Sequence, residues 1–141
     1  MRDGIVYAGT SDSARFMALD ARTGRLRFNF DAKAYIFSSA ALAGGFAYVG
    51  SHNGRLYCID AKTGKLAWEF QTEASKADPM KVLNLDGSLN REAFSPFFGD
   101  FQDMYIDFYR FASIGAIMSS PVVDRGMVYV GSMDGSLYAL R

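Results

Sequence analysis

Three aspartates in the second half of the chain have the spacing of residues on one face of a helix. Asp100, Asp103 and Asp107 stand at positions i, i+3 and i+7, and this spacing brings side chains together on a helix. Carboxylates placed in this way could bind a divalent cation or act as a general acid and base. Because no glutamate or histidine joins them within this segment's pattern, we interpret them as the solvent-exposed face of a helix.

Two other residues could take part in chemistry. His52 lies beside the turn Asn53-Gly54 with no serine or cysteine near it in a nucleophile motif, so we expect an exposed turn residue. Cys58, the only cysteine, lies in an apolar run and is expected to be a small buried hydrophobic residue. One cysteine forms neither an internal disulfide nor a cysteine metal cluster. Because phosphate-binding loops, nucleophile elbows and zinc-ligand spacings are also missing from the sequence, it predicts no catalytic residue, no metal and no cofactor.

Composition limits the classes of partner. The chain has 141 residues, of which half are hydrophobic, and 15 basic residues balance 15 acidic ones. A field of one sign, as nucleic acid or an anionic membrane would require, is therefore not expected. No apolar stretch approaches the roughly 20 residues of a membrane-spanning helix, and residues 1–4 run into a predicted strand without a signal-peptide core.

The elements that must position these residues repeat along the chain. Val6-Tyr7-Ala8-Gly9 aligns with Tyr48-Val49-Gly50 and with Val128-Tyr129-Val130-Gly131. The spacing is 41 residues from the first glycine to the second and 81 from the second to the third. A period near 40 residues built of short strands is typical of β-propeller blades.

The second repeat is the clearest. It predicts four short strands at residues 38–42, 46–51, 55–60 and 65–70, separated by Gly44-Gly45, Asn53-Gly54 and Thr63-Gly64. Glycines in these turns supply the positive φ angles that tight hairpins need. Several strands are apolar on consecutive residues, which indicates that both of their faces are covered, as between stacked blades. We therefore predict an all-β fold, a partial β-propeller of four-stranded blades with a mainly helical insertion.

Two eleven-residue stretches, 18–28 and 58–68, share a pattern of aspartate, Thr-Gly and an aromatic residue. Both resemble the tryptophan-docking motif of the pyrroloquinoline-quinone (PQQ) type propeller family, and Ala139 begins a third copy. The first stretch departs by having Phe28 in place of tryptophan, and the second by having Cys58 in place of alanine. The resemblance covers residues 3–70 and 118–141. It implies that the motif residues are structural, with the aromatic rings packing between blades: Asp20, Thr23, Gly24, Phe28, Asp60, Thr63, Gly64 and Trp68.

The count of predicted strands is incomplete. Residues 1–70 hold a repeat without its first strand and a full repeat, and residues 118–141 hold a repeat without its fourth strand. A propeller needs at least about four blades. We expect a fragment of a longer propeller or copies that assemble through open blade edges, because unpaired strand edges promote association.

Residues 71–117 form the insertion and lack the docking motif. Asn90 is predicted to cap a short helix that ends before Pro96. A helix over about 97–112 follows, with an apolar stripe at spacings of three and four residues: Phe97, Phe98, Phe101, Met104, Tyr105, Phe108, Phe111 and Ala112. Burying a phenylalanine stabilises by about 1.5–3 kcal/mol, whereas burying unpaired carboxylates is costly. We therefore expect this stripe to pack onto protein, either this propeller or a partner, with the aspartates in water. The residues predicted to contact a partner are Phe97, Phe101, Tyr105 and Phe108.

Three functional interpretations follow. The first is a non-catalytic scaffold that binds protein, since PQQ-type propellers include scaffolds of outer-membrane assembly; this resemblance implies a periplasmic or extracytoplasmic location. The second is part of a PQQ- and calcium-dependent quinoprotein dehydrogenase, although the adjacent cysteine pair found in many such enzymes cannot form with Cys58 alone. The third is the sensor domain of a signalling protein.

Overall fold

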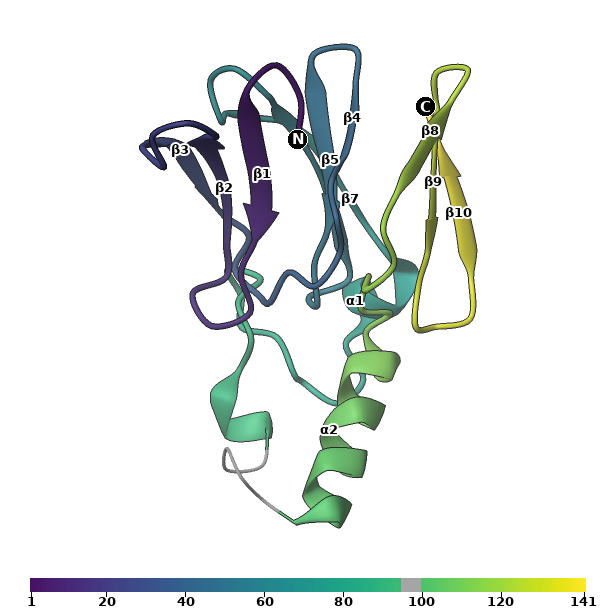
Figure 1. The fold of residues 1–141 in the computed structure, drawn as a ribbon. Helices are drawn as coiled ribbons and strands as arrows, with labels where there is room; N and C mark the ends of the chain where they lie inside the picture. Colours follow the sequence, from purple (N-terminus) through teal and green to yellow (C-terminus); the bar gives the residue numbers. More distant parts are fainter. Residues whose placement is uncertain (95–99) are drawn as a thin grey trace.

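Three antiparallel sheets lie side by side in the computed structural model, which describes residues 1–94 and 100–141 (Figure 1). The first sheet contains β1 (Ile5–Gly9), β2 (Arg15–Asp20) and β3 (Leu26–Asp31) in the order β1-β2-β3. These are the three strands predicted for the incomplete first repeat. We call this sheet blade 1.

Blade 2 is the complete four-stranded sheet. It contains β4 (Ala41–Ala43), β5 (Phe46–Gly50), β6 (Arg55–Asp60) and β7 (Leu66–Gln71) in sequence order. Four strands are present as predicted, but the first covers Ala41–Ala43 in place of the predicted residues 38–42. Gly54 closes the β5–β6 hairpin with a φ of 72°, a left-handed conformation that glycine adopts at little cost.

Blade 3 contains β8 (Val122–Asp124), β9 (Met127–Gly131) and β10 (Leu137–Leu140) in the order β10-β9-β8. These are the three strands predicted for the third repeat. The fold class, a mostly β partial propeller, is as the sequence predicts.

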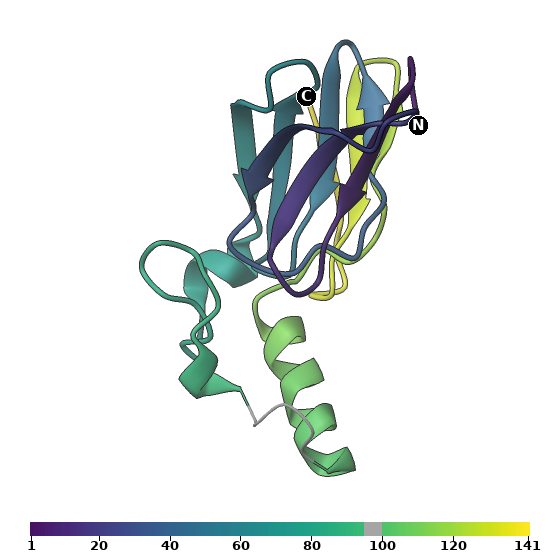
Figure 2. The same ribbon diagram turned by 60° about the vertical axis from the view of Figure 1, so that its left-hand side comes forward.

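The insertion lies between β7 and β8. It contains α1 (Glu73–Ala77), the short 3-10 helix η1 (Arg91–Ala93) and α2 (Phe101–Ser113). Asn90 caps η1 by accepting a hydrogen bond from the Glu92 backbone amide, as predicted. Figures 1 and 2 agree that α2 projects away from the sheets, at the end of the molecule opposite to both termini.

The core consists of two clusters, one on each side of blade 2. The cluster between blades 1 and 2 is made of Phe16, Ala32, Ile36, Ala47, Val49, Tyr57 and Ile59. The cluster between blades 2 and 3 is made of Leu56, Ile117, Val128 and Val130. Because β6 contributes to both clusters, its consecutive apolar residues are covered on both faces, as expected of a strand between stacked layers. Cys58 is 1% exposed, which confirms its prediction as a buried residue.

Neighbouring blades are joined by the same contact twice. Ile36 packs against Gly9 of blade 1, and Ile117 packs against Gly50 of blade 2. A Cβ at either glycine would clash with the isoleucine, so the repeated glycine allows a close approach between the chain segments of adjacent blades. The glycines were visible in the sequence repeat, but their isoleucine partners were not.

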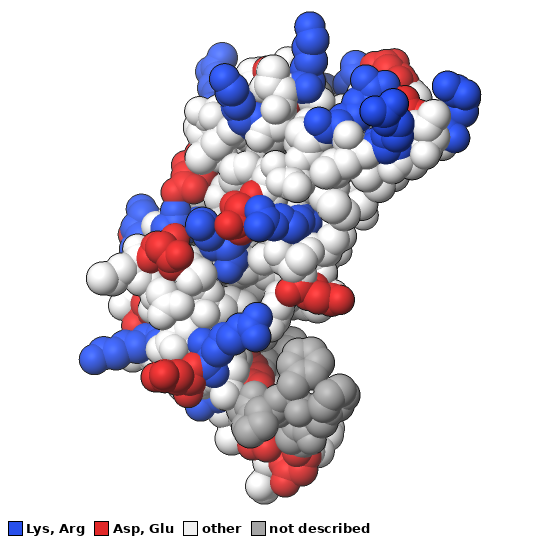
Figure 3. Space-filling view, turned by 90° about the vertical axis from the view of Figure 1, so that its left-hand side faces the viewer, with Lys and Arg blue, Asp and Glu red and all other residues white. Residues whose placement is uncertain are grey.

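Charges are mixed over the surface. Figure 3 shows basic and acidic side chains interspersed over much of the face formed by blade 1, with basic side chains gathered toward the end opposite α2 and an uncharged area between. With 15 residues of each sign in the whole chain, no extended field of one sign covers this face.

Candidate functional site

The aspartate of each docking motif closes a turn. Asp20 Oδ1 accepts hydrogen bonds from the backbone amides of Arg22 at 3.2 Å and Thr23 at 2.9 Å, and from the Thr23 hydroxyl at 2.8 Å. Its other oxygen pairs with Arg27 at 2.8 Å. The hydrogen bonds from Arg27 and Thr23 lower the pKa of Asp20 to about 2. The carboxylate is therefore fully charged and committed to the turn, which leaves little capacity for a ligand.

The second motif repeats this turn. Asp60 Oδ1 accepts from the backbone amides of Lys62 at 3.0 Å and Thr63 at 2.7 Å, and from the Thr63 hydroxyl at 2.9 Å. The Thr63 amide and hydroxyl hold the pKa of Asp60 below its usual value. Gly64 follows with a φ of 73°. The equivalent geometry of the two turns places their aromatic residues, Phe28 and Trp68, at equivalent points of β3 and β7.

The two aromatic residues lie at blade interfaces. Phe28 packs against Gly64 of the next blade, where a Cβ would be 2.5 Å from the ring. Trp68 lies 5.9 Å from the ring of Tyr48 and packs on the cluster between blades 2 and 3. Trp68 is half-buried, as is Phe28 at the equivalent point of blade 1. The motif residues therefore connect blades.

Helix α2 is capped at its N-terminus by an aspartate. Its N-cap, Asp100, accepts hydrogen bonds from the backbone amides of Gln102 at 2.9 Å and Asp103 at 3.1 Å. An aspartate here also interacts favourably with the positive end of the helix dipole. The helix ends at Ser113, and the next residues, Ile114–Ile117, are buried against blade 2. That buried segment fixes the orientation of the helix about its own axis.

The apolar side of α2 faces away from the chain. Phe101 is 75% exposed and Phe108 is 56% exposed. The exposed large hydrophobic residues of the helix are Phe101, Met104, Tyr105, Ile106, Phe108 and Tyr109, and we call them the α2 face. The expectation that the predicted stripe packs onto the propeller is therefore wrong for Phe101, Met104, Tyr105 and Phe108, whereas Phe111 does contact His52. Packing of the stripe on a partner stays a prediction. The predicted residues Phe97 and Phe98 lie outside the described residues.

The charged side of α2 faces inward instead. Asp103, Asp107 and Arg110 are half-buried, and Arg110 pairs with Asp107 at 2.9 Å. The expectation that all three aspartates face water is wrong for Asp103 and Asp107, because both are half-buried. In the described part of the chain, no three His, Cys, Asp or Glu side chains are grouped closely enough to hold a metal.

His52 differs from its prediction most clearly. It is 2% exposed, where the sequence predicted an exposed turn residue. Its backbone amide and its Nδ1 atom both bond to the carbonyl oxygen of Tyr35, at 2.9 and 3.0 Å. The rings of Phe37 and Phe111 lie 4.5 and 4.9 Å from the imidazole. Burial lowers the pKa of His52, so the ring is neutral at pH 7.

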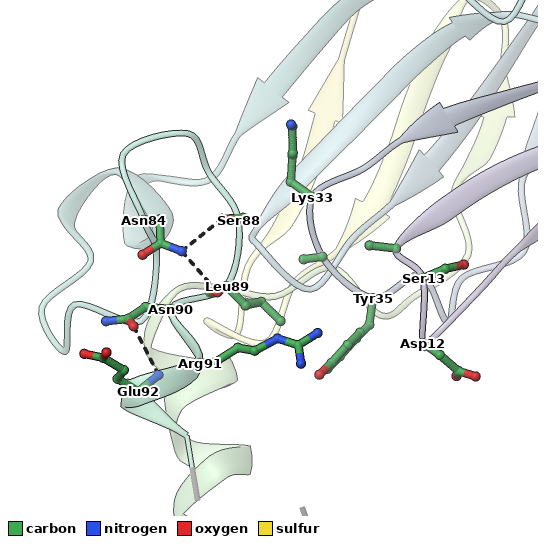
Figure 4. Close-up of a pocket in the computed structure, with 12 residues that line it drawn as sticks. Asp12, Ser13, Lys33, Tyr35, Asn84, Ser88, Leu89, Asn90, Arg91 and Glu92 are labelled. Atoms are coloured by element: carbon green, nitrogen blue, oxygen red, sulfur yellow. Dashed lines mark hydrogen bonds between the residues drawn. The ribbon is translucent and has the colours of Figure 1, made fainter. Parts of the chain in front are cut away.

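Two cavities lie next to His52 and the aromatic rings around it. The aromatic cavity has a volume of about 670 Å³ and is lined by Ser11, Asp12, Tyr35, Phe37, His52, Arg91 and Phe111. The polar cavity, of about 680 Å³, lies between blade 1 and the insertion, and the side chains shown there include Lys33, Asn84, Asn90 and Glu92 (Figure 4). Three residues line both cavities: Asp12, Tyr35 and Arg91.

Asn53 connects the insertion to blade 1, a role the sequence analysis missed. Its side-chain amide is fully buried and donates to the carbonyl oxygens of Ala32 at 3.1 Å and Gly87 at 3.0 Å. The Tyr57 hydroxyl donates to the same Ala32 oxygen at 2.8 Å. In the sequence, Asn53-Gly54 indicates only a hairpin turn, because turn propensity does not reveal long-range partners of the side chain.

A serine–glycine contact that occurs once in blade 2 and once in blade 3 was also missed in the sequence analysis. The Ser38 hydroxyl donates to the Gly50 carbonyl at 2.9 Å and accepts from the Gly50 amide at 3.0 Å. Ser119 makes the same two bonds to Gly131, at 2.8 and 2.9 Å. Comparison of Ser38-Ser39-Ala40 with Ser119-Ser120-Pro121 could have indicated this repeat.

The geometry agrees with comparison to known families. A family model of PQQ-type repeats, described as outer membrane protein assembly factor BamB, matches residues 1–90. This chain belongs to that family. No curated protein sequence matches the chain.

The chain is also similar to parts of larger proteins whose structures have been solved. A quinohemoprotein alcohol dehydrogenase from Comamonas testosteroni matches with a TM-score of 0.56 and 25% identity, over 92% of this chain and 16% of that one. BamB from Moraxella catarrhalis matches with a TM-score of 0.50 and 21% identity, over 98% and 46%. The computationally designed protein Ika8 matches with a TM-score of 0.58 and 13% identity, over 99% and 31%. The chain thus spans less than half the length of each of these three structures.

Proposed function

We propose that this member of the PQQ-type propeller family is a non-catalytic, protein-binding scaffold module and that the α2 face contacts the partner. The observation that supports the proposal is the orientation of α2, which is opposite to the one expected from the sequence. The residues of the α2 face are exposed, while Asp103, Asp107 and Arg110 are half-buried. A contiguous exposed apolar surface of this kind marks an interaction site in a water-soluble domain.

The partner that fits best is an amphipathic helix of another protein. Phe101, Met104 and Phe108 follow a spacing of three and four residues, which presents a continuous seam to a second helix. Asp100 is exposed at the start of the seam, so a basic residue beside the partner's apolar stripe would complement it. The same aspartate disfavours an anionic lipid surface.

The family supports the scaffold assignment and an extracytoplasmic location. The matching family model is described as an outer membrane protein assembly factor, and assembly at an outer membrane requires contacts with other proteins outside the cytoplasm. Among the described residues no helix is long and apolar enough to cross a membrane. On the family resemblance alone, we propose a periplasmic or extracytoplasmic location for the module.

A second candidate is part of a PQQ-dependent dehydrogenase, favoured by the 25% identity to the Comamonas enzyme. The residues present do not fit that cofactor and its calcium ion. Cys58 is the only cysteine and is buried within blade 2. The carboxylates of Asp20 and Asp60 are used within their turns. We therefore assign no redox step to this chain.

Sedimentation velocity tests whether the α2 face binds a different protein or a second copy of this chain. The wild-type chain is compared with a Phe101→Ser/Phe108→Ser variant, and Gln102→Ser on the same helix is the control. If the face binds a different protein, the two changes leave the association state of the purified chain unchanged. A dimer that the double variant abolishes and the control retains would show that a second copy occupies the face and would contradict the proposal.

A further inference from the structure

The aromatic cavity has the properties of a ligand site, and it lies on the inward side of α2, away from the α2 face. Its walls are the rings of Tyr35, Phe37, His52 and Phe111. The ring centroids of Phe37 and Phe111 lie within 5 Å of His52, so the rings form one continuous surface. A volume of about 670 Å³ is in the range of small-ligand and side-chain pockets.

His52 supplies one polar group of fixed character. Its Nδ1 atom lies 3.0 Å from the Tyr35 carbonyl oxygen, which can only accept, so Nδ1 carries the proton. In the neutral ring Nε2 then has a free lone pair and acts as an acceptor. No residue of the described chain donates a hydrogen bond to it. The cavity therefore offers a hydrogen-bond acceptor among aromatic rings, which suits an aromatic ligand with an N–H group.

Arg91 supplies the second polar group. It lines both the aromatic and the polar cavity, and Figure 4 shows its side chain extending toward Tyr35. Its guanidinium group makes no ion pair with any described residue, whereas Lys33, the other cation shown, pairs with Asp31 at 3.3 Å. An unpaired guanidinium at the boundary between the two cavities favours a carboxylate placed next to the aromatic group.

We infer that this cavity binds a tryptophan side chain of a partner polypeptide that is followed by an acidic residue. The indole ring lies between Phe37 and Phe111, its N–H donates to His52 Nε2, and the neighbouring carboxylate pairs with Arg91. Tryptophan and arginine are the residues that most often dominate protein interfaces. This second contact goes beyond the proposed function of the α2 face and does not depend on it.

The only histidine of the chain provides a direct readout. The imidazole signals of His52 are followed by NMR while acetyl-Trp-Asp-amide, acetyl-Ala-Asp-amide or acetyl-Trp-Lys-amide is added to the full chain. Saturable shifts are expected with the first peptide and none with the second. The third should bind roughly tenfold more weakly, because it replaces attraction to Arg91 with repulsion.

Variants at exposed positions keep the test independent of folding. Arg91→Ala should weaken the first peptide by roughly tenfold and remove its advantage over acetyl-Trp-Lys-amide. Phe37→Ala should also weaken it, since Phe37 is 57% exposed and can be truncated without disturbing the core. Arg25→Ala, at a distant exposed arginine, should change nothing. Phe108→Ser should retain peptide binding, which separates this site from the α2 face.

Three results would overturn the inference. The first is the absence of peptide-dependent shifts at His52, or equal shifts with the alanine peptide. The second is an Arg91→Ala variant that binds as well as Arg25→Ala. The third is indole-3-acetate binding as tightly as acetyl-Trp-Asp-amide, which would assign the cavity to a small molecule in place of a polypeptide.

Discussion

The ring of Phe28 in blade 1 lies directly over the backbone of Gly64 in blade 2. A Cβ at position 64 would be 2.5 Å from the Phe28 Cγ atom and 2.8 Å from its Cβ. The last residue of the first docking motif, Phe28, therefore packs on the glycine of the second motif, Gly64. This contact explains why an aromatic residue and a glycine recur together in a repeat that stacks blade on blade.

Gly64→Ala should separate blade docking from backbone strain when it is compared with Gly24→Ala. Both glycines have positive φ, 73° and 69°, but a Cβ at Gly24 meets nothing within 4 Å. Gly24→Ala should lower the free energy of unfolding by about 1–2 kcal/mol through left-handed strain alone. Gly64→Ala should cost about 1–3 kcal/mol more because of overpacking against Phe28. Urea unfolding measures both, and equal losses would contradict the docking contact.

Ser38→Ala should destabilise the chain more than Ser119→Ala. Each hydroxyl makes the same two bonds to a glycine backbone, but Ser38 is buried and Ser119 is exposed. Losing Ser38 leaves the buried Gly50 amide and carbonyl unsatisfied, at a cost of about 1–3 kcal/mol. Water replaces the Ser119 bonds, so that loss should be below about 1 kcal/mol. Thermal or urea unfolding of the two variants tests this order.

Stability should fall as the pH drops below 6.5 because His52 is buried. Burial lowers the pKa of His52 below its ordinary value of 6.5. Between that lowered pKa and 6.5 the unfolded chain takes up a proton and the folded chain does not. The free energy of unfolding then decreases toward acid pH, by at most about 1.4 kcal/mol per pH unit. An NMR titration midpoint for His52 at or above 6.5, or an unchanged pH slope in His52→Phe, would contradict this.

Truncation of two phenylalanines on α2 should have different effects on stability. Phe108 is exposed, so Phe108→Ala should change the free energy of unfolding by less than about 0.5 kcal/mol. Phe111 contacts His52 and lies 4.8 Å from Phe94, so Phe111→Ala should cost about 2 kcal/mol. A large loss for Phe108→Ala in a monomeric sample would show that the α2 face packs on the chain itself.

The strands and turns could be predicted from the sequence because their signals are local and repeated. Glycine and aspartate set the turns at Asp20 and Asp60 through contacts within five residues, and the same pattern appears twice. The apolar β6 indicated coverage on both faces. Each of these features depends on neighbours in sequence.

The orientation of α2 and the burial of His52 could not be predicted, because both are set by distant segments. Helical periodicity defined an apolar stripe but not the direction in which it faces. That direction is fixed by Ile114 and Ile117, which are buried against blade 2. His52 lies in a hairpin of the kind that is usually exposed, yet Tyr35, Phe37 and Phe111 cover it.

Site-specific photo-cross-linking from α2, followed by reconstitution, tests the protein-binding function most directly. Tyr105→p-benzoylphenylalanine places the probe on the α2 face, and the same change at Arg25 is the control. The protein identified is then purified, and its affinity is measured for the wild-type chain and for Phe101→Ser/Phe108→Ser. We predict cross-linking to one protein from position 105 alone, and affinity at least roughly tenfold lower for the double variant. Cross-linking only to lipid or to a second copy of the chain, or equal affinity of the double variant, would contradict the proposal.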